Sequence, residues 1–206
     1  MKNLAIITAR GGSKRIPRKN IRDFLGKPII AYSIESALKS NVFDEVMVST
    51  DDDEIAEIAK EYGAKIPFKR SAETSNDTAT TTDVIIEVLN EYKKRGIIFD
   101  YACCIYPTAP FITAESLKSG LDKMLKNATE AAIPVVKYSY PIQRALEIDS
   151  EGKLSMLYPE HSRSRSQDLT SCYHDAGQFY WFKVSAIKSD MELLKMNASP
   201  IIIPET

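Results

Sequence analysis

A glycine- and cation-rich segment near the N-terminus contains the residue types that bind phosphate. Residues 9–20 read ARGGSKRIPRKN, and six of the thirteen residues from Arg10 to Arg22 are Lys or Arg. Adjacent glycines let backbone N–H groups approach an anion, because no Cβ stands in the way. Ser13 adds a hydroxyl donor, and Arg10, Lys14 and Lys19 add positive charge. The segment therefore predicts a binding site for a polyphosphate.

The spacing of this segment differs from the common phosphate motifs. Neither GxxxxGK[ST] nor GxGxxG occurs at these glycines. A solvated basic loop and a nucleic-acid patch are the alternative interpretations. Nucleic-acid patches usually contain interleaved aromatic residues or follow a helix face, and this segment does neither. Because 27 basic residues balance 28 acidic ones, we expect no nucleic-acid partner.

The surrounding sequence alternates between apolar strands and amphipathic helices. Residues 4–9 form a short apolar run, typical of a strand covered on both faces, and Pro28 is expected to begin a helix. Further strands are expected over 46–49, 101–106, 131–136, 177–184 and 201–203, and further helices after Asp51–Asp53, over 82–95 and over 115–126. This order predicts a three-layer, Rossmann-like α/β fold with a mostly parallel sheet. Ligands of such folds bind at the carboxyl ends of the strands, where the basic segment lies.

The pattern changes at Lys137. Residues 137–176 are polar, with Leu146 alternating with Ile148 and Leu154 with Met156 on either side of Gly152. This predicts a β-hairpin and a loop outside the sheet. We interpret 1–136 and 177–206 as a nucleotide-binding core, and 137–176 as an inserted, projecting lobe.

Composition excludes several other classes of protein. The 206 residues are 44% hydrophobic and 27% charged, which is typical of a globular domain. No apolar run approaches the ~18 residues of a membrane span, and the N-terminus does not resemble a secretory signal. Three cysteines form no disulfide framework, and the two histidines exclude a three-histidine zinc centre. We therefore expect a cytoplasmic protein with no membrane partner, and Cys103 and Cys104 packed in the core.

The segment ARGGSKRIPRKN resembles the signature of the CMP-sialic acid synthetase family, whose members activate nine-carbon 2-keto sugar acids. The resemblance extends to RSAETSNDTATTTDV at 70–84, to the PTAP turn ending at Pro110, and to DAGQFYWF at 175–182. Within the family, YPTAPF, PIQRALEI and SQDL…YHDAGQFYWF are most similar to the pseudaminic acid cytidylyltransferase branch. The resemblance implies a nucleotide-diphospho-sugar transferase fold and transfer of CMP from CTP to the anomeric hydroxyl of the sugar acid, with release of pyrophosphate. It also implies a homodimer, in which the lobe mediates dimerisation and completes the partner's sugar pocket.

The resemblance also implies roles for individual residues. Arg10, Gly11, Gly12, Ser13 and Lys14 would bind the triphosphate, with Arg10 and Lys19 as the catalytic cations and Asn20 holding the nucleotide. Cytosine and ribose would be framed by Arg70, Asp77, Thr78, Ala79 and Thr80, although Thr80–Asp83 could equally be a helix N-cap. The sugar-acid candidates are Tyr106, Gln143, Arg144, Arg163, Arg165, His174, Gln178 and Tyr180.

Two of these candidates depart from the sialic-acid branch. Tyr106 stands where that branch has glutamine, and His174 where it has arginine, which argues against sialic acid itself. For His174, a surface histidine is the alternative interpretation. The run from His161 to Arg165 could likewise be a solvated loop.

The metal site is a further departure from the family pattern. Family members carry a DxD pair after a strand like 201–203 that binds Mg²⁺, whereas this sequence ends at Pro204-Glu205-Thr206. We expect Mg²⁺ as the cofactor, with no carboxylate ligands identified here; either the chain is truncated or the metal is held differently. The acids at Asp51–Asp53 are explained by the start of a helix.

Rival functions remain open at this point. They are synthesis of a CMP-sialic, CMP-legionaminic or CMP-KDO donor, a sugar-1-phosphate nucleotidyltransferase, whose GxGTR…PK loop does not occur here, and a non-catalytic nucleotide sensor.

Overall fold

The computed structural model describes residues 1–14, 16–188 and 193–204, so Arg15 of the basic segment and the C-terminal Glu205 and Thr206 lie outside the described residues. The chain divides into two compact units. The first comprises Met1–Pro134 and Gly177–Ile201, and the second comprises Val135–Ala176 with the residues from Ile202 onward. The separate roles of core and lobe stay a prediction.

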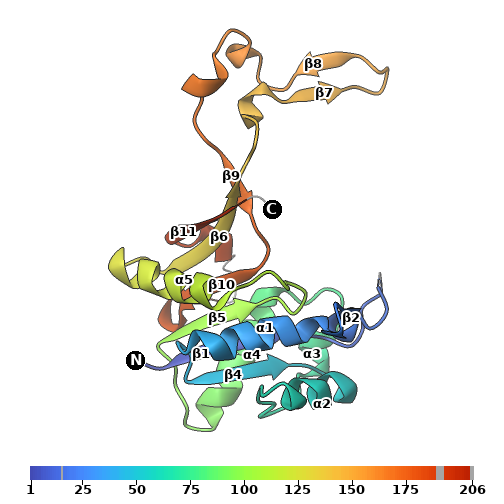
Figure 1. The fold of residues 1–206 in the computed structure, drawn as a ribbon, viewed down its shortest axis with the longest axis vertical. Helices are drawn as coiled ribbons and strands as arrows, with labels where there is room; N and C mark the ends of the chain where they lie inside the picture. Colours follow the sequence, from blue (N-terminus) through green and yellow to red (C-terminus); the bar gives the residue numbers. More distant parts are fainter. Residues whose placement is uncertain (15, 189–192, 205–206) are drawn as a thin grey trace. The chain divides into compact units, whose positions relative to one another are not determined.

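A mixed, mainly parallel sheet forms the centre of the first unit (Figure 1). Its strand order is β11 (Ala198–Ile203), β6 (Ala131–Lys137), β10 (Phe179–Lys183), β5 (Tyr101–Ile105), β1 (Asn3–Thr8) and β4 (Glu45–Ser49). The strand β1 pairs in parallel with both β4 and β5, and β10 runs antiparallel between β5 and β6. The α/β prediction is confirmed, with β10 as an antiparallel insertion.

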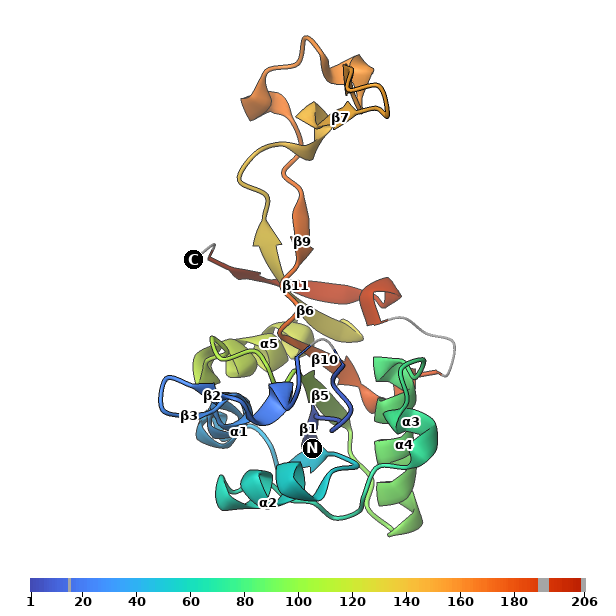
Figure 2. The ribbon, with the colours of Figure 1, turned by 90° about the vertical axis from the view of Figure 1, so that its right-hand side faces the viewer.

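Helices cover both faces of this sheet and make three layers. The helices α1 (Ile29–Ser40) and α5 (Ala114–Lys126) pack together on one face, and α4 (Thr81–Lys94) covers the other (Figure 2). The remaining helices are α2 (Asp53–Glu61) and the short α3 (Ala72–Ser75). A capping box between Thr80 and Asp83 begins α4, which confirms the N-cap interpretation of these residues.

Three short elements between β1 and α1 were not predicted. They are a 3₁₀ turn at Lys19–Ile21 and the two-residue strands β2 (Asp23–Phe24) and β3 (Lys27–Pro28), which pair with each other. Elements this short have no apolar periodicity, which is why the sequence pattern did not indicate them. They return the chain from the basic segment to α1.

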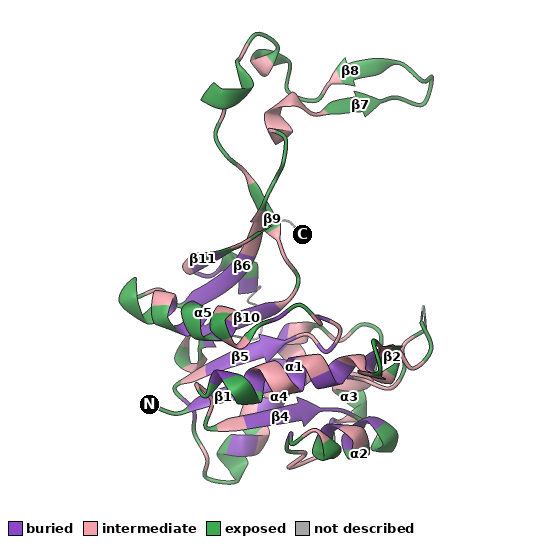
Figure 3. Ribbon diagram, in the orientation of Figure 1, coloured by how far each residue is buried: buried purple, intermediate pink, exposed green. Residues whose placement is uncertain are grey.

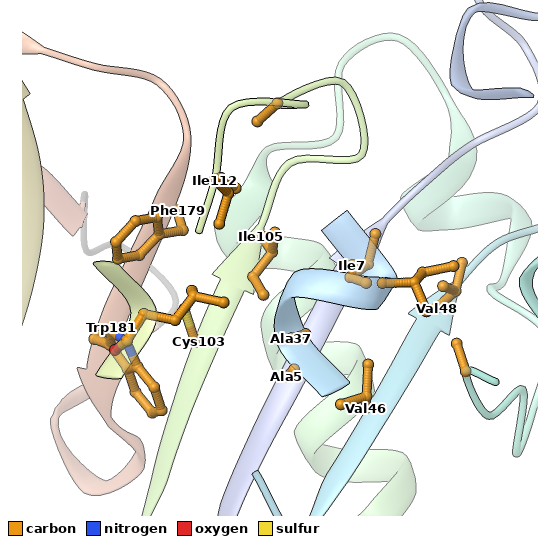
Figure 4. Packing of buried hydrophobic residues seen from close by; sticks show 14 of the residues in the cluster. Ala5, Ile7, Ala37, Val46, Val48, Cys103, Ile105, Ile112, Phe179 and Trp181 are labelled. Atoms are coloured by element: carbon orange, nitrogen blue, oxygen red, sulfur yellow. The ribbon is translucent and has the colours of Figure 1, made fainter. Parts of the chain in front are cut away.

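The core packs around fully buried aromatic and aliphatic side chains of the central strands (Figure 4). Trp181 is completely buried; its ring stacks on Phe43 at 4.9 Å, and its Nε1–H donates to the Leu117 carbonyl at 2.9 Å. Gly120 of α5 allows this approach, because a Cβ there would lie 2.8 Å from Trp181 Cδ1. Cys103 and Cys104 are completely buried, as expected.

The second unit contains the predicted hairpin. The strands β7 (Leu146–Ile148) and β8 (Leu154–Met156) pair antiparallel, and Gly152 between them has a φ of +78°. The strand β9 (Tyr173–Asp175) pairs antiparallel with the end of β6. Both hairpin strands are largely exposed, including the apolar Leu146, Ile148 and Leu154 (Figure 3).

Across the described residues, the structure contains no helix with both the length and the apolar surface that crossing a bilayer requires.

Candidate nucleotide-binding site

A pocket of about 770 Å³ lies at the carboxyl ends of β1 and β5. Its walls come from the segment after β1, the connection that leads through α3 to α4, and the turn after β5. Parallel neighbouring strands end at one edge of a sheet, so segments far apart in the sequence meet there. The residues that line it are Thr8, Arg10, Ser13, Lys14, Ile16, Lys19, Asn20, Arg70, Thr74, Asn76, Asp77, Ala79, Thr80, Thr81, Val84, Tyr106, Pro107 and Thr108.

Ten of the predicted site residues line this pocket: Arg10, Ser13, Lys14, Lys19, Asn20, Arg70, Asp77, Ala79, Thr80 and Tyr106. Gly11, Gly12, Thr78, Gln178 and Tyr180 are in the first unit but do not line it. Thr74 and Asn76 line it and were not singled out, although they lie inside the 70–84 segment. Thr8 and Thr108 also line the pocket and were not predicted. Both are short polar residues at or just after a strand end, and that position was the signal that could have identified them.

Two cations of the basic segment are paired with a carboxylate across the pocket. Arg10 Nη1 lies 2.9 Å from Asp77 Oδ1, and Lys14 Nζ contacts the other oxygen of the same carboxylate. Arg10 Nη1 also donates to the Asn76 carbonyl at 2.7 Å. Hydrogen bonds from Lys14 and Arg10 hold the pKa of Asp77 below its ordinary value. In the free protein, Asp77 is therefore ion-paired with two of the cations that are predicted to bind phosphate.

Asn20 combines a structural bond with an unused acceptor. Its side chain is buried, and Nδ2 donates to the Arg10 carbonyl at 2.9 Å. Its Oδ1 is buried and has no hydrogen-bond partner among the described residues. Since an unsatisfied buried oxygen is costly, this atom is suited to accept a hydrogen bond from a ligand in the pocket.

Arg70 forms part of the pocket wall from a largely buried position. Its Nε donates to Ser49 Oγ at 2.9 Å, and its Nη2 donates to the Ser49 carbonyl at 2.6 Å. Burial lowers the pKa of the guanidinium, and the nearby Asp51 and Glu87 carboxylates oppose that shift. An arginine remains charged in proteins despite such a shift, so this side of the pocket is also cationic.

Tyr106 connects the pocket to the start of β10. Its backbone N–H donates to the Gln178 carbonyl at 2.9 Å, and its ring meets the Tyr180 ring edge-on at 5.6 Å. Tyr180 is only 5% exposed, so it supports Tyr106 from within the core. Of the predicted sugar-acid residues, Tyr106 is the one that lines this pocket among the described residues.

The other five sugar-acid candidates belong to the second unit. Gln143 Nε2 donates to the Thr170 carbonyl, Arg144 Nη1 donates to the Ser164 carbonyl, and the His174 ring lies 5.0 Å from that of Tyr138. Arg163 and Arg165 are exposed. Their role in sugar binding stays a prediction.

The described residues do not form a metal site. No three His, Cys, Asp or Glu side chains in residues 1–14, 16–188 and 193–204 are grouped to hold an ion. The one carboxylate in the pocket lining of these ranges, Asp77, is already paired with two cations. The described pocket lining therefore offers no unpaired carboxylate to Mg²⁺.

The explanation of Asp51–Asp53 by a helix start is incomplete. Asp52 does cap α2, accepting the Ile55 N–H at 3.0 Å. Asp51, however, accepts the Gly11 N–H at 2.9 Å and thus contacts the basic segment. The sequence pattern did not indicate this contact, because it depends on β1 and β4 being neighbours in the sheet.

Comparisons with known proteins agree with this architecture. A family model described as cytidylyltransferase matches residues 4–193. The pseudaminic acid cytidylyltransferase of Campylobacter jejuni is 46% identical over 204 residues, which cover 99% of this chain and 88% of that protein. The CMP-N,N'-diacetyllegionaminic acid synthase of Legionella pneumophila is 36% identical over 154 residues, covering 75% of this chain and 66% of that protein.

A solved structure supports the fold assignment. The structure of CMP:2-keto-3-deoxy-manno-octonic acid synthetase in complex with CTP superposes with a TM-score of 0.73 at 21% identity, covering 100% of this chain and 91% of that one. It thus shares the fold of this chain. Because the family model spans most of the sequence and the Campylobacter relative aligns over nearly all of it, the chain belongs to the cytidylyltransferase family, whose members are nucleotidyltransferase enzymes.

Proposed function

We propose that this chain transfers CMP from CTP to the anomeric hydroxyl of a nine-carbon 2-keto sugar acid, with pseudaminic acid as the preferred acceptor. The observation that carries this proposal is the convergence of Arg10, Lys14 and Lys19 on one pocket at the carboxyl end of β1. The 46% identity to the Campylobacter enzyme supports pseudaminic acid over the other sugar acids.

The reaction needs charge stabilisation more than covalent chemistry. The anomeric oxygen forms a bond to the α-phosphorus of CTP, the bond from that phosphorus to the bridging oxygen breaks, and pyrophosphate leaves; the hydroxyl proton passes to solvent. Arg10 and Lys14 would hold the triphosphate and its departing pyrophosphate. Lys19 would stabilise the negative charge that develops at the α-phosphate.

The other walls of the pocket suit a cytidine. Asn20 Oδ1 would accept a hydrogen bond from a ribose hydroxyl. The backbone N–H groups of Thr78 and Ala79 already donate to Asn76 Oδ1. Because these donors are used within the loop, the loop would offer its carbonyl oxygens to the ligand. Carbonyl acceptors suit the exocyclic amine of cytosine.

Thr80 and Asp77 fit their predicted ligand roles less well. Thr80 Oγ1 is used in the α4 capping box, so its hydroxyl serves the helix. The Asp77 carboxylate pairs with Arg10, a cation that is predicted to bind phosphate, which does not match the predicted role in framing cytosine and ribose. We therefore assign Asp77 to the phosphate end of the pocket.

The proposal extends to a homodimer in the cytoplasm. The hairpin exposes Ile148 by 71% and Leu154 by 63%, and exposed apolar groups of this kind are typical of an interface. A second copy that covers them would also bring the sugar-acid candidates of the second unit into use. A molecular mass of one chain by light scattering would contradict this part of the proposal. The three free cysteines are consistent with a reducing compartment.

In this proposal Mg²⁺ is the counter-ion of CTP, and the described residues supply no ligand cluster for it. Magnesium commonly binds through substrate phosphates and water with few carboxylates. Pyrophosphate release should therefore be measured both with and without Mg²⁺.

The test is pyrophosphate release from CTP with pseudaminic, legionaminic, N-acetylneuraminic and KDO acids as acceptors, alongside a sugar 1-phosphate. We expect the highest kcat/KM with pseudaminic acid. Faster turnover with another sugar acid would overturn the choice of acceptor, and turnover with the sugar 1-phosphate would indicate the rival nucleotidyltransferase. CTP binding by calorimetry without turnover on any acceptor would indicate a nucleotide sensor and contradict the proposal.

A further inference from the structure

We propose that Asp51 and Asp52, at the start of α2, are positioning residues that hold the nucleotide loop, residues 10–20, in its CTP-binding conformation. The inference rests on the proposed function, because it concerns the same pocket. Neither carboxylate lines that pocket, so both would act through the loop.

The N-terminal end of the nucleotide loop is packed directly against these acids. The Gly11 N–H donates to Asp51 Oδ1 at 2.9 Å. A Cβ on Gly11 would lie 2.6 Å from Asp52 Oδ2 and 2.8 Å from Asp52 Cβ, closer than side-chain atoms can approach. Glycine is therefore needed here for contact with α2, and not only for contact with phosphate.

The C-terminal half of the loop is held by the same carboxylate. Arg18 Nη1 donates to Asp52 Oδ2 at 2.7 Å, and its Nη2 contacts Glu54. Arg18 does not line the pocket, unlike Lys14 and Lys19 on either side of it in the sequence. One cation of the loop thus serves as an anchor while its neighbours face the ligand.

Asp52 remains ionised in this position. Its side chain is 20% exposed, and burial alone would raise its pKa. The Ile55 N–H and the Arg18 guanidinium outweigh that effect, so the pKa lies below the ordinary value. A single charged group therefore caps α2 and binds the loop.

The physical reason for such anchors is the charge of the loop itself. Five cations within the eleven residues of the loop repel one another, and in the absence of ligand they favour an extended chain. Anchoring the loop on the acids of α2 lowers that repulsion and keeps Arg10, Lys14 and Lys19 in the lining of one pocket. A site organised before binding loses less free energy on ordering when the ligand arrives.

The structure offers closely matched variants for a test. Asp52→Asn keeps the size and the helix-capping ability of the residue while removing the charge that binds Arg18. Arg18→Gln removes the other partner, and Arg18→Lys restores a cation. Asp53→Asn is the control, because Asp53 is 82% exposed and pairs with Lys69 instead of the loop.

We expect Asp52→Asn and Arg18→Gln each to raise the Kd and KM for CTP by about three- to tenfold, as for loss of a charged hydrogen bond that acts indirectly. The KM for the sugar acid and the melting temperature should match those of Asp53→Asn. The double variant Asp52→Asn/Arg18→Gln should bind CTP no more weakly than either single variant. Arg18→Lys should recover part of the CTP affinity that Arg18→Gln loses. Fully additive effects, or CTP affinity equal to that of Asp53→Asn, would overturn the proposal.

Hydrogen exchange without nucleotide separates this inference from the proposed function. The hydrogen-bonded backbone amides of Gly11 and Ser13 should exchange faster in Asp52→Asn and Arg18→Gln than in the wild type and in Asp53→Asn. Unchanged exchange would refute the anchoring even if CTP binds. If the wild-type chain failed to bind CTP, the proposed function would be refuted. If the variants still lost loop protection in that case, the anchoring would remain supported.

Discussion

Replacing Arg10 by alanine tests the phosphate assignment most directly. The Arg10 side chain is 34% exposed, lines the pocket, and directs Nη1 to the Asn76 carbonyl and to Asp77. A charged hydrogen bond of this kind contributes about 1.5–3 kcal/mol. Its loss should weaken CTP binding by about ten- to a hundredfold.

The contact with Asp77 sets where in that range the result should fall. Because Asp77 already pairs with Arg10 and Lys14 in the free protein, CTP gains these cations only by replacing a carboxylate. The net loss in Arg10→Ala should therefore lie toward the lower end. By the same reasoning, Asp77→Asn should bind CTP more tightly than the wild type, since the competing anion is removed.

Isothermal titration with CTP is the appropriate assay, because it measures affinity without requiring the sugar acid. Arg22→Ala is the matched control: it removes the same charge from the same basic segment, but the exposed Arg22 does not line the pocket. A salt series adds a second measurement, since a lost phosphate contact should reduce the dependence of affinity on ionic strength.

The reasoning would be refuted by either of two results. If Arg10→Ala bound CTP as tightly as Arg22→Ala, the Arg10 side chain would not bind the triphosphate. If Asp77→Asn bound CTP more weakly than the wild type, the carboxylate would be a ligand of the nucleotide, as the family resemblance implied, and would not compete for the cations that bind phosphate.

Three further predictions concern stability and reactivity. Gly120→Ala should lower the free energy of unfolding by about 1–3 kcal/mol in urea titrations, because the added methyl overlaps Trp181; a neutral effect would show that the ring can shift. With thiol reagent at pH 8, Cys172 should react first, since burial raises the pKa of Cys104 to about 12 and shields both β5 thiols; rapid labelling of all three would contradict the packing. Glu35 accepts hydrogen bonds from two lysines that lower its pKa, so its stabilising contribution is complete above its ordinary value of 4.5 and is lost as the pH falls through the lowered one. Glu35→Gln should therefore flatten the decline of the urea midpoint below pH 4.5, and an unchanged decline would show that the pair contributes nothing.

The order of the elements could be predicted because its signals are local. Apolar runs marked β1 and β5, and 3.6-residue periodicity marked α1, α4 and α5, each within a short window of sequence. The hairpin of the second unit was likewise visible from alternation around Gly152. The strands β2 and β3 were missed because two residues are too few to show a periodic pattern.

The prediction of a phosphate site also came from the sequence, since glycines, cations and a hydroxyl lie together in one segment. The sequence did not reveal what those cations contact in the folded chain. It treated Arg18 as one more charge of the basic segment, and the structure pairs it with Asp52. It treated Asp51 as part of a helix start, and the structure places it on the Gly11 N–H.

Residue types and periodicity thus determined that this chain is a layered α/β protein, and they predict an anion-binding loop after its first strand, because both inferences depend on neighbours in the sequence. Only the tertiary structure decided which acids meet which cations. The contacts of Arg18 with Asp52 and of the Gly11 N–H with Asp51 join residues 34 and 40 positions apart, and they exist because β1 lies beside β4 in the sheet, so that the chain segments leaving those two strands come together at one edge.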